Sequence, residues 1–294
     1  STWGSRIYKD FVPKRSDCMV EILEANDALI YAKALASLGR DQSAQKSIAT
    51  AWRTLRLSAD EEMTFMARHR KLLKPHHNAR LDWTLWQGWR GNAKSMLAYV
   101  SKDAQNLAKA RLGLMTNAQG VDGLIAAVPQ TLTKSPGLAH ARFSWRLRKG
   151  LTDRAITLLI EHSRSKKKLG QPEKWAKQRQ IMVRELMGRK KYRQAYSLAS
   201  THHLDKGAQF ATLEWLSGFI ALRRLKQPDL AIRHFTKLKN TVETPISLGR
   251  AGYWLGRAHS ASGDKASAKI AYTFAAQHQS SFYGLLAAEK VGIR

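Results

Sequence analysis

Two neighbouring stretches near the end of the chain decide the fold: residues 245–259 read PISLGRAGYWLGRAH and residues 281–290 read SFYGLLAAEK, with Gly263 and Asp264 between them. The first stretch has the order of a helix-turn-helix repeat, in which small and apolar residues precede a glycine turn and a second apolar series follows. The series are Tyr253, Leu255 and Gly256 before the turn at Gly263, and Ala268, Tyr272 and Ala275 after it.

The same pattern recurs upstream at a regular spacing. Ala195, Ala231 and Ala268 are 36 and 37 residues apart, and each is followed four residues later by Ala199, Phe235 or Tyr272. A small residue lets two helices approach closely, and the residue one helical turn later fills the groove beside it. A repeat of this length predicts an α-solenoid built from TPR-like helical hairpins.

Composition agrees with an all-α fold. Apolar residues make up 44% of the 294 positions, which is enough for a large core, and only seven prolines interrupt the chain. Alternating runs of Val, Ile and Thr, which would indicate strands, are missing. We expect one domain over residues 1–294, with degenerate repeats at 1–79, central repeats at 80–190 and the clearest repeats at 191–294.

The chain is strongly basic, with a formal net charge of +28. Residues 142–191 hold 16 basic and four acidic residues. Arg142, Arg146 and Lys149 have the spacing of one helix face, and we predict that they contact an anion. The alternative is a solvated face that serves solubility, and an acidic polymer of either the wall or the nucleic-acid class would fit the charge.

Three tryptophans, Trp83, Trp86 and Trp89, recur every three residues and predict one broad helix stripe. We expect Trp83 and Trp86 to pack in the core, as large aromatics do. Trp89, flanked by Gly88 and Arg90, is a candidate for stacking on a sugar ring.

Residues for catalysis or metal binding do not form a recognisable set, so we expect no catalytic residue, no metal and no cofactor. No Glu occurs between Glu62 and Glu161, and the aspartates in that interval are scattered among different repeats. The pairs His76-His77 and His202-His203 would point about 100° apart on a helix, and we expect them in turns or at the surface. Cys18 is the only cysteine, which excludes an internal disulfide. Asp153 and Asp264 precede helical runs and are predicted helix caps.

Residues 282–290, Phe-Tyr-Gly-x-Leu-Ala-Ala-Glu-Lys, resemble the end of the superhelical domain of soluble lytic murein transglycosylases. Glu214-Trp215-Leu216, Lys174-Trp175 and Arg80-Leu81-Asp82 extend the resemblance over most of the chain, which is weakest in residues 1–79. Ala176 departs from the family, where a second aromatic residue is expected beside Trp175.

The resemblance implies a right-handed superhelical arm of a periplasmic enzyme that cleaves MurNAc-GlcNAc bonds of peptidoglycan to 1,6-anhydro products. The family's lysozyme-like catalytic domain would follow Arg294, and its Glu-Ser and Gly-Leu-Met-Gln motifs do not occur here. Gly113-Leu114-Met115-Thr116 mimics the second motif in a predicted repeat helix, without an acid partner. We therefore expect a non-catalytic fragment whose partners are glycan strands and its own catalytic domain.

The localisation rests on the resemblance alone, because the sequence shows neither an export signal nor an apolar run long enough to span a membrane. A second hypothesis is a stand-alone basic helical-repeat adaptor for nucleic acid or an acidic protein. The lack of a base-reading code at fixed repeat positions argues against the adaptor.

Overall fold

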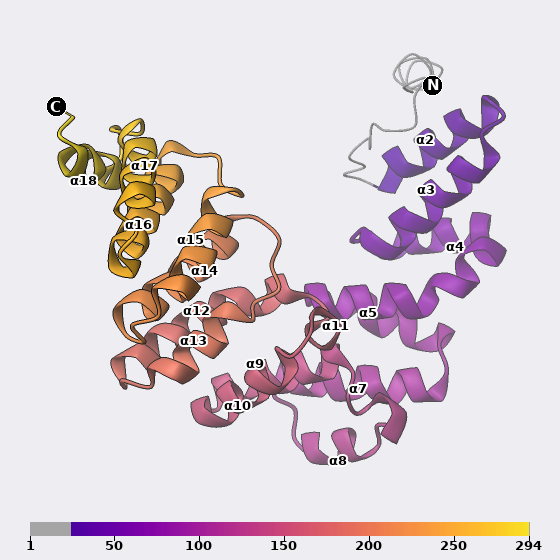
Figure 1. Ribbon diagram of the computed structural model, residues 1–294. Coiled ribbons are helices and arrows are strands. Elements are labelled where there is room, and N and C mark those ends of the chain that lie inside the picture. Colours follow the sequence, from indigo (N-terminus) through magenta and orange to yellow (C-terminus); the bar gives the residue numbers. More distant parts are fainter. Residues whose placement is uncertain (1–24, 294) are drawn as a thin grey trace. The chain divides into compact units, whose positions relative to one another are not determined.

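The computed structural model describes residues 25–293, so Cys18 and the first part of the predicted 1–79 segment lie outside the described residues. Within that range every regular element is helical, which confirms the all-α fold (Figure 1). The chain forms two compact units, one up to Trp145 and one from Arg146. The continuous right-handed superhelix stays a prediction.

The first unit contains α-helices of six to 15 residues. Its helices are α2 (Ala25–Ser37), α3 (Asp41–Thr54), α4 (Ala59–Leu73), α5 (His77–Gln87), α6 (Arg90–Ser95), α7 (Lys102–Thr116), α8 (Val121–Ala126) and α9 (Pro136–Arg148), of which α9 runs across the unit boundary. Short 3-10 helices are η1 (Lys74–His76), η2 (Met96–Tyr99) and η3 (Gln130–Leu132). The predicted repeat helix around Gly113 is α7, so the Gly-Leu-Met-Thr sequence is helical as expected.

The second unit has longer and more regular hairpins. Its helices are α10 (Thr152–His162), α11 (Lys166–Leu169), α12 (Pro172–Gly188), α13 (Tyr192–Ser200), α14 (Ala208–Arg223), α15 (Pro228–Lys239), α16 (Pro245–Ser262), α17 (Lys265–Ala276) and α18 (Phe282–Val291). From α12 onward each helix packs on the next one in the chain, and α14 also contacts α12 and α16 (Figure 1). Contacts between successive and alternate helices are the packing of stacked helical hairpins.

The hairpin turns share one backbone geometry. A residue with φ between +58° and +88° ends each turn, and an alanine five residues later is buried in the second helix. The turn residues are Gly39, Gly150, Lys190, Lys226 and Gly263, and the alanines are Ala44, Ala155, Ala195, Ala231 and Ala268. The burial predicted for the last three alanines is confirmed, and the pattern extends to the α2–α3 and α9–α10 turns.

Close helix packing explains why the repeat needs small residues. A Cβ built on Gly218 of α14 would lie 2.6 Å from the ring of Phe235, and one on Gly256 of α16 would lie 2.6 Å from the ring of Tyr272. Phe235 and Tyr272 are both buried, so the residues predicted to fill the grooves do so. The predicted small residues of the same helices, Ala231 and Ala268, are buried too. The glycines that face the two rings, Gly218 and Gly256, were not part of the predicted pairing.

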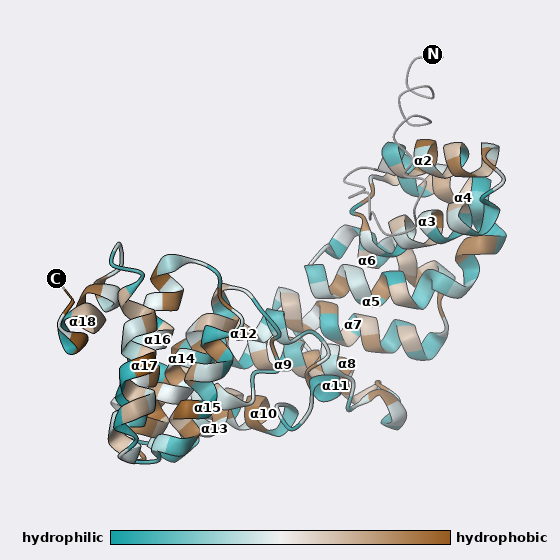
Figure 2. Cartoon of the chain, turned by 45° about the horizontal axis from the view of Figure 1, so that its top comes forward, coloured by the Kyte–Doolittle hydropathy of each residue, from teal (hydrophilic) through white to brown (hydrophobic). Residues whose placement is uncertain are grey.

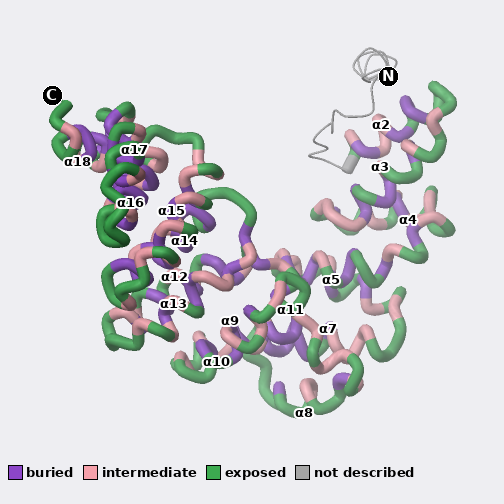
Figure 3. Tube along the Cα trace, viewed as in Figure 1, coloured by how far each residue is buried: buried purple, intermediate pink, exposed green. Residues whose placement is uncertain are grey.

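Helix α14 is enclosed by its neighbours, because α13, α15 and α16 all pack against it (Figure 3). It is apolar almost throughout, whereas α15 has a hydrophobic and a hydrophilic face (Figure 2). Glu214 lies in the middle of α14 and is buried with it. Because α14 is enclosed, the carboxylate of Glu214 needs hydrogen-bond or ion-pair partners within the unit.

Candidate functional site

The three basic residues predicted to share a helix face do not all lie in a helix. Arg142 and Arg146 are half-buried in α9, but α9 ends at Arg148 and Lys149 lies in the exposed turn that follows. The guanidinium of Arg146 donates to the carbonyl of Arg154 at 2.8 Å. The expectation of one continuous face through Lys149 is wrong, because Gly150 in the left-handed region turns the chain there. Anion binding by Arg142, Arg146 and Lys149 stays a prediction.

The predicted tryptophan stripe also ends early. Gly88, with φ +74°, terminates α5 after Gln87, so Trp89 lies in the turn before α6 and is half-buried. Trp86 is buried as expected, whereas Trp83 is half-buried and its indole Nε1 donates to the carbonyl of Thr54 at 3.0 Å. Sugar stacking by Trp89 stays a prediction.

Two expectations about polar residues need correction. Asp264 caps α17 by accepting the backbone N–H of Ser267 at 2.9 Å, as predicted, but Asp153 lies inside α10 and pairs with Arg189 at 2.7 Å. His77 and His202 were expected in turns or at the surface. His77 begins α5 and is buried, and His202 lies in the loop between α13 and α14 but is buried as well. His77 packs edge-on to the Trp52 ring and His202 binds Glu214.

The strongest polar cluster of the second unit surrounds Glu214, whose side chain is 1% exposed. His202 Nε2 lies 3.0 Å from Oε1 of Glu214, and His234 Nδ1 lies 2.6 Å from Oε2. The ammonium of Lys237 also donates to Oε1 and lies over the ring of Phe210 at 5.1 Å. The hydroxyl of Tyr196 is 3.0 Å from Nε2 of His234 and extends the cluster to α13.

The hydrogen bonds fix the protonation state of His202. The backbone N–H of Leu204 donates to Nδ1 at 2.9 Å, so Nδ1 is unprotonated and Nε2 carries the proton given to Glu214. Burial lowers the pKa of His202 and outweighs the opposing effect of the Glu214 carboxylate. His202 is therefore a neutral imidazole that orients the carboxylate.

Glu214 itself is held ionised. Burial acts to raise the pKa of Glu214, but hydrogen bonds from His202, His234 and Lys237 overcome it and hold the pKa far below its usual range. A general acid must carry a proton at the working pH and must reach its substrate. Glu214 meets neither requirement, so the cluster is suited to joining helices and not to proton donation.

A second polar network joins four helices of the first unit, α3, α4, α5 and α6. Arg80 of α5 is fully buried and lies 2.6 Å from Glu62 of α4, while its Cζ lies 4.3 Å from the centre of the Trp52 ring. Asn92 and Ser95 donate to the same Glu62 carboxylate at 2.9 and 2.7 Å. Burial lowers the pKa of Arg80, and the hydrogen bond with Glu62 opposes that effect.

This network forms one wall of an open pocket of 590 Å³ next to the α3–α4 turn. The pocket also contains Glu61, but Glu61 closes a capping box with Ser58 through contacts of 2.7 and 3.3 Å. Both carboxylates at this pocket are thus engaged in helix ends and helix contacts. The pair does not offer the one free acid and one free base of two-carboxylate glycosidases.

The role of Glu214 was not predicted from the sequence, where the residue stood out only as part of a motif. The available signal was its place as the one acidic residue in the apolar sequence AQFATLEWLSGFIALR of α14. Its partners could not be predicted, because His202, His234 and Lys237 come from a loop and from the next helix.

Residues 25–293 contain no group of three His, Cys, Asp or Glu side chains arranged to hold a metal ion. In the same range, every helix falls short of the length and apolarity needed to cross a bilayer. Comparison of the chain with protein-family models, curated proteins and solved structures finds no match.

Proposed function

We propose that this chain is the non-catalytic helical arm of a soluble lytic murein transglycosylase and that it binds peptidoglycan. In the whole protein the arm would contact glycan strands and position the catalytic domain that cleaves MurNAc-GlcNAc bonds to 1,6-anhydro products. The proposal places the chain in the periplasm. The resemblance of residues 282–290 and of the segments at Arg80, Lys174 and Glu214 to that family supports it.

The observation that carries the non-catalytic part of the proposal is the engagement of the interior carboxylates. Glu214 is ionised and enclosed, and Glu62 receives Arg80, Asn92 and Ser95. Cleavage of a glycosidic bond by this family requires one protonated Glu, so these residues serve the fold. The net charge of +28 supports binding to a polymer that carries carboxylates.

The test is sedimentation of the chain with purified peptidoglycan sacculi across a salt series, followed by mass analysis of released muropeptides. We expect salt-sensitive pelleting and no anhydro product. The variant R142E/R146E/K149E should pellet less than K167E/K177E/R193E, which reverses three charges on α11, α12 and α13. Equal pelleting of both variants would show that Arg142, Arg146 and Lys149 do not contribute to binding. An anhydro product would overturn the non-catalytic proposal.

The second candidate is an adaptor for nucleic acid, favoured by the basic segment at residues 142–191, whose charge would suit a phosphate backbone equally well. An equal mass of RNA in the sedimentation assay separates the two. If the chain binds RNA tightly and does not pellet with the sacculi, the adaptor hypothesis replaces the arm hypothesis.

A further inference from the structure

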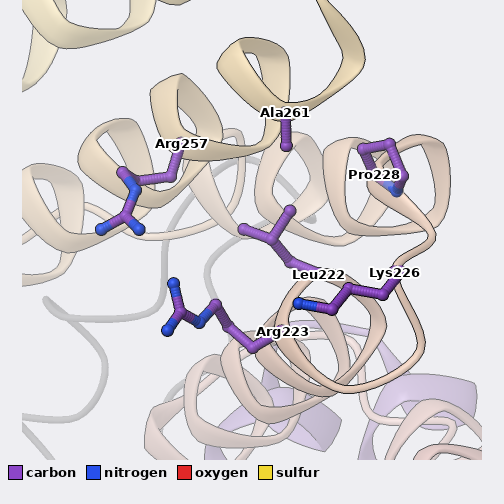
Figure 4. Close-up of a pocket in the computed structure, with 6 residues that line it drawn as sticks. All are labelled: Leu222, Arg223, Lys226, Pro228, Arg257 and Ala261. Carbon is purple, nitrogen blue, oxygen red and sulfur yellow. The ribbon is translucent and has the colours of Figure 1, made fainter.

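The second unit has a pocket of 220 Å³ where α14, α15 and α16 meet (Figure 4). Its lining is Leu222, Arg223, Lys226, Pro228, Arg257 and Ala261. Half of these residues are cationic and none is acidic. The other half, Leu222, Pro228 and Ala261, give the pocket apolar walls, which strengthen the field of nearby charges.

The three cations come from different segments and gather at one place. Figure 4 shows the guanidinium groups of Arg223 and Arg257 on the same side of the pocket, with the ammonium of Lys226 directed toward Arg223. Within the described residues none of the three forms an ion pair with a carboxylate. Like charges brought together without a counterion repel one another, and a bound anion would relieve that repulsion.

Arg257 is held in place before any ligand binds. It is half-buried, one guanidinium nitrogen donates to the Tyr253 hydroxyl at 3.2 Å, and its Cζ lies 5.6 Å from the centre of the Trp254 ring. A positioned guanidinium presents two N–H groups to the two oxygens of a carboxylate or phosphate. Ordering this side chain on binding therefore costs little entropy.

Two backbone features lie at the pocket. Lys226 has φ +58°, at a turn position that is glycine in Gly39, Gly150 and Gly263. Pro228, which lines the pocket, is the first residue of α15, and the N-terminus of this helix has no side-chain cap. Asp229 follows in the first turn but is not among the residues that line the pocket.

From these observations we infer that the pocket formed by Arg223, Lys226 and Arg257 binds a single oxyanion group, a phosphate or a carboxylate. Its volume suits one such group and its immediate substituent. The inference does not depend on the proposed function, because peptide stems carry carboxylates and nucleic acids carry phosphates. The chemistry of the preferred oxyanion would show which source the pocket serves.

The experiment is a titration of the full chain with inorganic phosphate and, separately, with acetate at constant ionic strength, followed by NMR of the arginine Nε–Hε signals. We expect saturable shifts of the Arg223 and Arg257 signals with at least one of the two anions. The variant R223Q/K226Q removes two exposed charges and leaves the contacts of Arg257 with Tyr253 and Trp254 intact. Its affinity should fall at least about tenfold, as expected for the loss of charge-assisted hydrogen bonds.

The matched control is K177Q/R193Q, which removes two exposed charges from α12 and α13 and should bind within about twofold of the unmodified chain. Stronger binding of phosphate would identify a phosphate site, and stronger binding of acetate a carboxylate site. Linear shifts without saturation for both anions would overturn the inference. Equal losses in the two variants would also overturn it, because they would reflect overall charge.

Discussion

Oε2 of Glu214 lies 2.6 Å from Nδ1 of His234, and this contact joins the middle of α14 to the middle of α15. On its other side His234 meets the hydroxyl of Tyr196 in α13 at 3.0 Å. The buried carboxylate of Glu214 thus takes part in a hydrogen-bonded chain that connects α13, α14 and α15. In a repeat protein each hairpin contacts mainly the neighbouring hairpins, so we expect this connection to make adjacent hairpins unfold together.

We expect Glu214→Gln to lower the free energy of unfolding by about 3 kcal/mol, because an amide has one acceptor oxygen and its NH2 group would face a histidine N–H or the Lys237 ammonium. Chemical denaturation followed by circular dichroism measures the change. Glu161→Gln, at an exposed position of α10, is the control and should change stability little. A loss equal to that of the control would show that the cluster does not stabilise the unit.

Stability should decrease as the pH falls, in two steps with different causes. Burial lowers the pKa of His202 in the folded chain. Below about pH 6.5 the unfolded chain therefore binds a proton at this residue that the folded chain does not, and folding becomes less favourable. The pKa of Glu214 is held low despite its burial, so its contribution is full above about 4.3 and is lost as the pH falls below that value. Denaturant titrations between pH 2 and 8 measure both steps. His202→Gln should reduce the upper step, and an unchanged slope above pH 5 would contradict the assignment.

Gly284→Ala should displace α18 from its hairpin. A Cβ at Gly284 would lie 1.9 Å from the carbonyl oxygen of His278, and backbone cannot move aside as a flexible side chain can. We expect a loss of about 2 kcal/mol or more, from the cost of overpacking. Gly188→Ala, where a Cβ meets nothing within 4 Å, is the control and should be neutral or slightly stabilising. Equal stability of the two variants in thermal unfolding would show that α18 is not packed this closely.

We expect Lys226→Gly to raise the stability of the chain and to weaken anion binding at the pocket. Glycine adopts the left-handed conformation of this turn without the steric cost that lysine bears, so we expect a gain of up to about 1 kcal/mol. The same variant loses one cation of the pocket and should bind phosphate or acetate more weakly. Thermal unfolding and the anion titration measure the two effects on one sample. A lower melting temperature of the variant would contradict the claim that Lys226 is strained in this turn.

The repeat could be predicted because its cause is local. Ala195, Ala231 and Ala268 recur at spacings of 36 and 37 residues, and in the last two repeats a large residue follows one helical turn later. Helix packing requires small residues where two axes approach. The packing of Phe235 on Gly218 and of Tyr272 on Gly256 follows from that rule. The positions where helices end were harder to predict. Lys149 and Trp89 have the spacing of a continuing helix face, but the helix ends before each of them because Gly150 and Gly88 adopt the left-handed conformation.

The sequence by itself determined an all-α chain of helical hairpins with a high positive charge, since apolar period, turn chemistry and charge are properties of the residues and their order. Only the tertiary structure decided that Glu214 is an ionised interior residue and that Arg223, Lys226 and Arg257 share one pocket. The physical reason is distance along the chain: the ionisation of a carboxylate and the field of a pocket depend on groups that folding brings within a few ångströms from separate helices.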